Sequence, residues 1–386
     1  MVDISYLICN EMLSYDGKYE EELCVNFCGE SLVLHKLNCK ILKVKGYIRK
    51  LYCHNSAIDV LEVPKSLYRL NCPKNKIKQI HYHEDLRILH CFDNEITKLN
   101  FLEGLQEVDC SNNRLTFIRP NKMLMALYCT HNQLTEFFPN LSLQSLNFSD
   151  NKIKEFEANE NLLRLSCSNN LLEKLILNKQ LIELCCDNNR LREILLDSEL
   201  ETLDCSRNRL QSLILNEELR NVACHFNELT CLKIPKNARK VICNNNRIKD
   251  LNLSDVERLT RLHCEYNQLE SLILNKKMHH LNCSYNNLRT LVLNKNLAYL
   301  LCCHNQLQSL RLNKFLISLN CSDNQLRNLE LGEYLNTVVC FNNPISKLEF
   351  HMCRRLNFAK FDATQVAQMN ILPTHYVNYS NNPMTY

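Results

Sequence analysis

A single pattern of apolar and polar positions recurs along most of this chain at every nineteenth position. The unit reads L-x-x-L-x-C-x-x-N-x-L-x-x-L-x-L-x-x-x, and residues 281–294 show most of it. The position written as Cys is occupied, in order, by Cys53, Cys72, Cys91, Cys110, Cys129, Phe148, Cys167, Cys186, Cys205, Cys224, Cys243, Cys264, Cys283, Cys302, Cys321 and Cys340. Every interval is the same except the one from Cys243 to Cys264, which is longer by two. Such self-similarity at a short period predicts a solenoid, in which each turn packs only on its neighbours.

The L-x-C segment of each unit alternates apolar and polar residues, which is typical of a half-buried strand. One strand per turn, always in the same direction, predicts a parallel sheet on the concave face. So short a unit leaves little room for a helix behind that sheet. The alternating run after the Asn, as in Leu291-Val292-Leu293, predicts a second short extended segment on the convex face. We therefore expect a mainly β repeat solenoid of about seventeen turns, with little helix outside the caps.

Two further columns of the pattern are almost invariant. Asn lies three residues after the Cys position in fifteen of the sixteen turns, with Ser56 as the exception, and Leu or Ile lies five residues after it in every turn. From about Leu34 onward the unit resembles the signature of leucine-rich repeats, L-x-x-L-x-L-x-x-N/C-x-L. The short unit with its Cys is similar to repeats of giant-virus and bacterial leucine-rich-repeat proteins. The resemblance implies the fold and an intracellular or host-cell setting, but it implies no substrate.

The pattern also divides the chain into three expected parts. Cys39 precedes Cys53 by only fourteen positions, which predicts a shortened first turn. Residues 362–372 are the best helix candidate, since Asp is a favourable N-cap and a Pro follows the segment. The expected parts are an N-terminal cap at 1–33, the leucine-rich-repeat solenoid at 34–350, and degenerate last repeats with a C-terminal cap at 351–386.

The 23 cysteines first suggest a secreted, disulfide-rich protein. The N-terminal residues show no signal-peptide pattern, and no stretch of about 18 apolar residues predicts a membrane span. We therefore expect an intracellular, cytoplasmic protein (in the host cytoplasm if it is viral) that is not secreted and keeps its cysteines as thiols. A thiol between two Leu columns behaves as a small hydrophobe. The net charge of +4 is spread over both signs, which argues against nucleic-acid and membrane partners.

Catalysis is not indicated by any motif. The sequence has no Gly-rich phosphate loop, no H-E-x-x-H and no nucleophile elbow. Cys24 and Cys28 form a C-x3-C pair without a second pair at the spacing of a zinc module. We expect no enzyme activity, no cofactor, no metal site and no small-molecule substrate.

The residues that vary between turns beside the Cys position predict a binding surface for a protein partner. Seven of the 13 histidines lie in these columns, and the densest patch belongs to the late turns. Tyr, Arg and His combine apolar area with a polar group, as binding hot spots do. The candidate partner-binding residues are Arg261, His263, Tyr266, His280, Tyr285, Tyr299, Cys303, His304 and Asp323.

Two alternative functions remain open from the sequence. A structural solenoid of a larger assembly would carry the same repeats without a discrete binding patch. A metal-sensing or redox-sensing protein would use the cysteines or histidines as ligands, although the position of the Cys column between Leu columns favours packing.

Overall fold

The computed structural model describes residues 2–5, 12–14, 18–196, 199–346, 348–349 and 353–362. The chain forms two compact units, Met1–Leu191 and Arg192–Tyr386. The described residues contain no α-helix, and all of their strand pairs are parallel. Within these ranges, no helix has the length and apolar character that crossing a bilayer requires.

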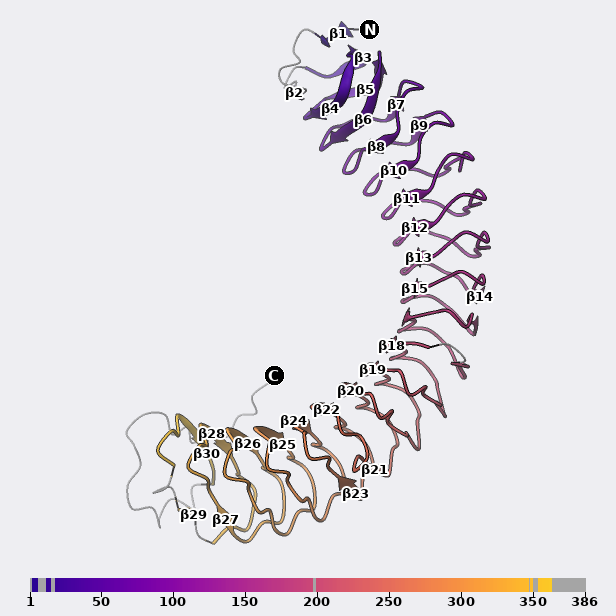
Figure 1. Cartoon of the computed structure of the whole chain (residues 1–386). Coiled ribbons are helices and arrows are strands. Elements are labelled where there is room, and N and C mark those ends of the chain that lie inside the picture. The colour runs from indigo at the N-terminus through magenta and orange to yellow at the C-terminus, as the bar shows by residue number, and fades with distance from the viewer. Residues whose placement is uncertain are drawn as a thin grey trace. The chain divides into compact units, whose positions relative to one another are not determined.

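In the first unit, a main sheet follows one side of the coil and a second set of strands follows the other side (Figure 1). The strands of the main sheet are β2 (Met12–Ser14), β4 (Gly29–His35), β6 (Ile48–His54), β8 (Arg69–Asn71), β10 (Ile88–His90), β11 (Glu107–Asp109), β12 (Ala126–Tyr128), β13 (Ser145–Asn147), β15 (Arg164–Ser166) and β17 (Glu183–Cys185). The strands of the other side are β1 (Val2–Asp3), β3 (Glu20–Asn26), β5 (Cys39–Lys45), β7 (Val60–Glu62), β9 (Gln79–His81), β14 (Glu155–Glu157) and β16 (Lys174–Ile176). The predicted pairing of a parallel sheet with extended segments behind it is confirmed.

The second unit repeats this arrangement. Its main sheet contains β18 (Thr202–Asp204), β19 (Asn221–Ala223), β20 (Lys240–Ile242), β22 (Arg261–His263), β24 (His280–Asn282), β25 (Tyr299–Leu301), β26 (Ser318–Asn320), β28 (Thr337–Val339) and β30 (Phe358–Lys360). Behind it lie two strand pairs, β21 (Asp250–Asn252) with β23 (Ser271–Ile273) and β27 (Leu329–Glu330) with β29 (Leu348–Glu349). The solvent side of each main sheet is called the strand face below.

The strands pair in register with the repeat. Leu281 lies opposite Leu300, and Leu300 opposite Leu319, each one unit further along the chain. Equivalent residues of consecutive turns therefore form columns about 4.8 Å apart. Columns are numbered here from the Cys position, which is column 0, so that Arg261 lies in column −3 and Tyr266 in column +2 of the turn that contains Cys264.

Column 0 lies inside the solenoid, as predicted. Its thiols, from Cys53 to Cys340, have exposed fractions of 0%, and the cysteines among the described residues are free. Burial raises the pKa of the Cys243 thiol to about 12, so it is protonated at neutral pH. Phe148 replaces the Cys in one turn and packs against Phe156, with ring centroids 4.9 Å apart. Phe137 also packs against Phe148, with ring centroids 6.2 Å apart, so three aromatic rings cluster in the interior at this point.

The Asn of column +3 joins each turn to the preceding one. The side-chain amide of Asn286 donates to the carbonyl oxygens of Cys264 at 3.0 Å and Cys283 at 3.1 Å. Its Oδ1 accepts a hydrogen bond from the Leu269 amide at 2.9 Å. Where Ser56 replaces Asn, its hydroxyl accepts from the Leu37 amide at 2.9 Å. The column therefore satisfies buried backbone groups, which is the structural role expected from the sequence.

A second Asn column, which the sequence reasoning did not identify, lies at position +11. Asn294 donates to the carbonyl oxygen of Asn275 at 2.7 Å and to that of Met278 at 3.1 Å. Asn313 makes the same two bonds one turn later, to Asn294 at 2.9 Å and Leu297 at 2.9 Å. The sequence did contain a signal for this column, because Asn recurs there at the period of the repeat. Where the column holds Asn, as at these two positions, it fixes the loop that leads into the next main-sheet strand.

Column +2 has an unusual backbone conformation. Its seventeen residues from Lys36 to Asn342 have φ between 51° and 58°, in the left-handed region. Asn and Asp tolerate this region better than other residues with a side chain, and they occupy nine of the seventeen positions. The other eight are Lys, His, Arg, Phe and Tyr. A bulky side chain at this position has an intrinsic conformational cost.

The N-terminal region differs from one expectation. Cys39 begins β5, on the side opposite the main sheet, so it does not start a shortened turn in column 0. Leu34 lies opposite Cys53 and Leu13 opposite Leu34, which places two leucines in that column. The sequence pattern missed them because the step from Leu13 to Leu34 is two positions longer than the repeat and neither position holds Cys. The boundaries predicted for the N-terminal cap, residues 1–33, remain a prediction.

The C-terminal region extends the main sheet by one turn. β30 pairs with β28 in a register that places Phe361, which is 6% exposed, in column 0 after Cys340. The helix expected at 362–372 lies outside the described residues apart from Asp362. The boundaries 34–350 and 351–386 also remain predictions.

Candidate functional site

Column +2 of the late turns carries a continuous stack of side chains on the strand face. The rings of Tyr266 and Tyr285 have centroids 4.2 Å apart and an interplanar angle of 12°. Tyr285 stacks in the same way on His304, at 4.2 Å and 18°. The His304 Nε2 then lies 3.3 Å from a carboxylate oxygen of Asp323. Four predicted site residues therefore form one ladder, with Tyr266 49% and Tyr285 39% exposed.

A second stack lies at the start of the strands, in column −3. The rings of His280 and Tyr299 are stacked and nearly parallel, with an interplanar angle of 3° and centroids 4.5 Å apart. His279 joins them through its Nδ1, which is 3.0 Å from the Nδ1 of His280. Arg261 occupies the same column one turn earlier, opposite His280 in the sheet. Arg261, His280 and Tyr299 are among the candidate residues named from the sequence, but their stacking and the participation of His279 were not predicted.

The two stacks lie on opposite edges of the strand face, because column −3 opens each strand and column +2 follows its end. Between them lie column −1, with His263, and column +1, with Cys303. The nine predicted residues are therefore one surface with two aromatic borders. Among the described residues, no group of three His, Cys, Asp or Glu side chains could hold a metal ion, so the geometry offers no argument for the metal-sensing alternative.

Burial and neighbouring charge shift the pKa values of this surface. Burial, followed by the charges of Lys240 and Arg261, lowers the pKa of His263. The pKa of His280 is lowered by burial first, and then by His279 and Arg261. Burial and the hydrogen bond to Tyr266 raise the pKa of Tyr285 to about 12. The lowered pKa values favour the neutral imidazole at His263 and His280, and the raised pKa favours the neutral phenol at Tyr285.

A groove of about 490 Å³ follows the ladder of column +2. Glu265 and Cys303 line it beside the aromatic rings. Burial raises the pKa of the Glu265 carboxyl, and its Oε2 has no hydrogen-bond partner in the part of the chain that the structure describes. Burial also raises the pKa of Cys303, so this thiol is a packing group and not an activated nucleophile. Sequence reasoning missed Glu265, because a single Glu in a variable column gives no signal.

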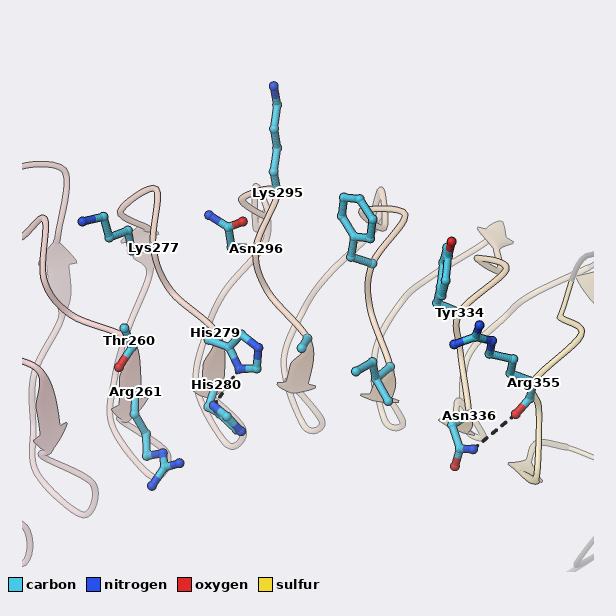
Figure 2. A pocket seen from close by; sticks show the side chains of 13 residues that line it. Thr260, Arg261, Lys277, His279, His280, Lys295, Asn296, Tyr334, Asn336 and Arg355 are labelled. Atoms are coloured by element: carbon cyan, nitrogen blue, oxygen red, sulfur yellow. Dashed lines mark hydrogen bonds between the residues drawn. The ribbon is translucent and has the colours of Figure 1, made fainter.

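A larger hollow of about 820 Å³ lies beside column −3, where the loops enter the strands. Figure 2 shows Lys277 and Lys295 projecting from these loops, with His279 near the strand start below them. The loop residues belong to column −6 and its neighbours, which the sequence reasoning did not consider. Their residue types differ from turn to turn, so only the stacking of the turns brings them together.

The sequence matches neither a model of a known protein family nor a curated protein. The structure is similar to that of YopM from Yersinia enterocolitica WA-314, with 27% identity and a TM-score of 0.76 over 82% of this chain and 73% of YopM. The functional domain of InlJ from Listeria monocytogenes, which includes a cysteine ladder, shares 24% identity at a TM-score of 0.59, over 74% of this chain and 66% of InlJ.

A plant peptide hormone receptor, RGFR1 in complex with RGF2, shares 16% identity at a TM-score of 0.59, over 90% of this chain and 81% of the receptor. The similarities extend over most of the chain, and the Cys and Asn columns agree with the repeat that the sequence predicts. The chain is a leucine-rich-repeat solenoid built from short units with a buried cysteine ladder.

Proposed function

We propose that this chain is a non-enzymatic protein-binding module whose partner docks on the strand face of the second unit. The observation that carries the proposal is the aromatic ladder of column +2. The backbone there is left-handed, and a residue other than Gly, Asn or Asp costs about 1 kcal/mol in that conformation. Tyr266 and Tyr285 nevertheless occupy it with large exposed rings.

Stability alone does not require tyrosine at these positions. Nine of the seventeen residues in the column are Asn or Asp, and those turns have the same backbone conformation. Stacking of adjacent rings contributes about 0.5–1.5 kcal/mol per pair, which does little more than offset the conformational cost. Exposed aromatic area that gains so little for the fold fits a contact surface, because such rings are common hot spots.

Other features support the same assignment. A receptor with a similar fold holds a peptide hormone, so the fold is compatible with peptide recognition. The neutral forms favoured at His263, His280 and Tyr285 suit a partner that buries apolar area on this face. The buried free thiols of column 0 support a reducing, intracellular location for the protein.

The test replaces Tyr266, Tyr285 and Tyr299 together with Ala. Proteins captured from a cell lysate by the wild type and by the variant are compared by quantitative mass spectrometry, and direct binding of each purified candidate is then measured. We expect loss of the direct binding with an unchanged melting temperature. The matched control replaces two strand-face aromatics of the first unit, Tyr52 and Tyr128, with Ala and keeps the binding. Equal binding by the wild type and the first variant would favour the alternative of a structural solenoid without a binding patch.

A further inference from the structure

The hollow beside column −3, here called the edge groove, has an unbalanced charge. Arg261, Lys277, Lys295 and Arg355 line it, and its lining includes no carboxylate among the described residues. None of these four cations makes an ion pair with another of the described residues. Arg355 instead lies over the ring of Tyr334, at 4.9 Å from its centroid (Figure 2). The positive charges therefore remain available to an external anion.

The loops that precede the edge groove carry both signs of charge, since Lys236 and Arg258 lie among their carboxylates. The equivalent loops of earlier turns in the same unit carry Glu199, Glu217 and Glu218. Glu217 lies 3.8 Å from Lys233 and accepts a hydrogen bond from the Lys236 amide, so it is part of a locally compensated loop. An anion that continued beyond the edge groove toward those turns would meet carboxylates. The groove thus favours a short acidic ligand over a long polyanion.

The floor of the edge groove combines apolar and amide groups. Ala298 and Ile317 line it between the basic loops, and Phe315 is 48% exposed beside them. Asn296 and Asn336 also line it, and the amide of Asn336 donates to the carbonyl oxygen of Arg355 at 3.2 Å (Figure 2). Asparagine side chains can pair with both the N–H and the C=O groups of a peptide. The basic residues of the edge groove would therefore complement acidic side chains of a peptide, and its Asn amides would complement the peptide backbone.

The aromatic residues of the edge groove are less suited to nucleic-acid bases. Lys314 lies over the ring of Phe315 at 5.0 Å, and Arg355 lies over Tyr334. His280 and Tyr299 are stacked on each other. Base recognition on single strands uses open aromatic faces together with a basic track along the phosphates. Here each of these rings already has a partner on one face, and the basic track ends within a few turns.

We propose that the edge groove binds an extended acidic segment of the partner protein. This inference rests on the proposed function, since Arg261 and His280 belong both to the groove and to the strand-face site. From Arg261 to Arg355 there are five steps between turns, or about 24 Å, which an extended peptide of about seven residues spans at about 3.3 Å per residue. In such a strand, alternate side chains face the groove. Acidic residues at every second position fit it.

The direct test is fluorescence anisotropy with a fluorescein-labelled peptide of five Glu-Ala repeats. The variant Lys277→Glu with Lys295→Glu is compared with the control Lys236→Glu with Lys249→Glu, which changes the net charge equally outside the groove. We expect saturable binding by the wild type, at least about tenfold weaker binding by the first variant, and a change below about twofold for the control. Raising the salt from 50 to 500 mM should reduce the difference between the first variant and the wild type.

Three results would overturn the inference. These are absence of saturable peptide binding by the wild type, equal weakening by both variants, and tighter binding of a ten-nucleotide oligouridine that the Lys277/Lys295 variant abolishes. A peptide of five Lys-Ala repeats serves as the negative probe. Circular dichroism and the melting temperature confirm that each variant is folded before it is titrated.

The outcomes separate this inference from the proposed function. If the Tyr266/Tyr285/Tyr299 variant still binds every partner but the Lys277/Lys295 variant loses the acidic peptide, the edge groove stands and the strand-face site fails. If the tyrosine variant loses its partner while the lysine variant keeps both the partner and the peptide, the strand-face site stands and the edge groove fails.

Discussion

Replacing Asn286 with Ala tests how the turns are held together. The substitution removes the acceptor of the buried Leu269 amide and the donor to the Cys264 carbonyl, both of which belong to the preceding turn. A buried polar group left without a partner costs about 1–3 kcal/mol. The Cys264 carbonyl keeps the hydrogen bond from the Asn267 side-chain amide at 3.1 Å, so the Leu269 amide is the group left without a partner, and the expected loss in the local free energy of opening is about 1–3 kcal/mol. Asn286 is only 7% exposed, so water has little access to the vacated bonds.

The matched variant is Asn286→Ser. At Ser56 a hydroxyl already accepts the equivalent amide bond, from Leu37 at 2.9 Å. Serine should therefore restore the acceptor of the Leu269 amide and most of the lost stability.

Native-state hydrogen exchange, read by mass spectrometry on peptides that cover 264–290, measures the local free energy directly. This local measurement suits a repeat protein, whose turns need not unfold together. The reasoning is refuted if the Leu269 amide keeps wild-type protection in the Ala variant, or if Ser is no better than Ala.

Four further outcomes follow from the structure. Cys302→Ser places a hydroxyl in the apolar column and should lower the free energy of unfolding by about 1–3 kcal/mol in a urea titration. Iodoacetamide should label the exposed Cys28 and Cys231 in the folded protein, and the column 0 thiols only after unfolding, as peptide mapping would show. Tyr285→Asn exchanges ring stacking for an easier left-handed backbone, so its melting temperature should stay within about 4 °C of the wild type. Because the folded pKa of His280 lies below the unfolded value of 6.5, the unfolded chain binds more protons, and stability should fall as the pH drops below 6.5. His280→Asn should flatten that dependence in thermal melts between pH 5 and pH 7.5, and an unchanged slope would exclude His280 as its source.

The sequence predicted the fold in detail because each repeated residue has a local reason. Leu300 and Cys302 are two residues apart along the strand, so both side chains point to the same face and into the interior. The constant length of the unit then determines the register of the sheet. Leu13 and Leu34 were missed because they do not carry the cysteine that marks the column elsewhere.

The candidate site was predictable only in part. Tyr266 and Tyr285 share a column, so the period alone placed them side by side. Lys277 and Lys295 are not separated by a whole repeat and belong to different columns, so their meeting at one groove depends on how the loops fold over the strand starts. The burial of one carboxylate oxygen of the half-buried Glu265 depends on the size of its neighbours, which no spacing rule describes.

The left-handed position in column +2 has a consequence for how this protein can change. Its backbone angle is almost the same whether the residue is Asn112, Arg207, Phe226 or Tyr285. A substitution there changes what the surface displays and leaves the path of the chain intact. Each turn thus has one position at which the side chain can be substituted while the spacing between turns stays constant. A new partner could be accommodated by substitutions at this position in a few adjacent turns. The side chains on the strand face can in this way change one turn at a time, while the interior residues that hold the turns together stay the same.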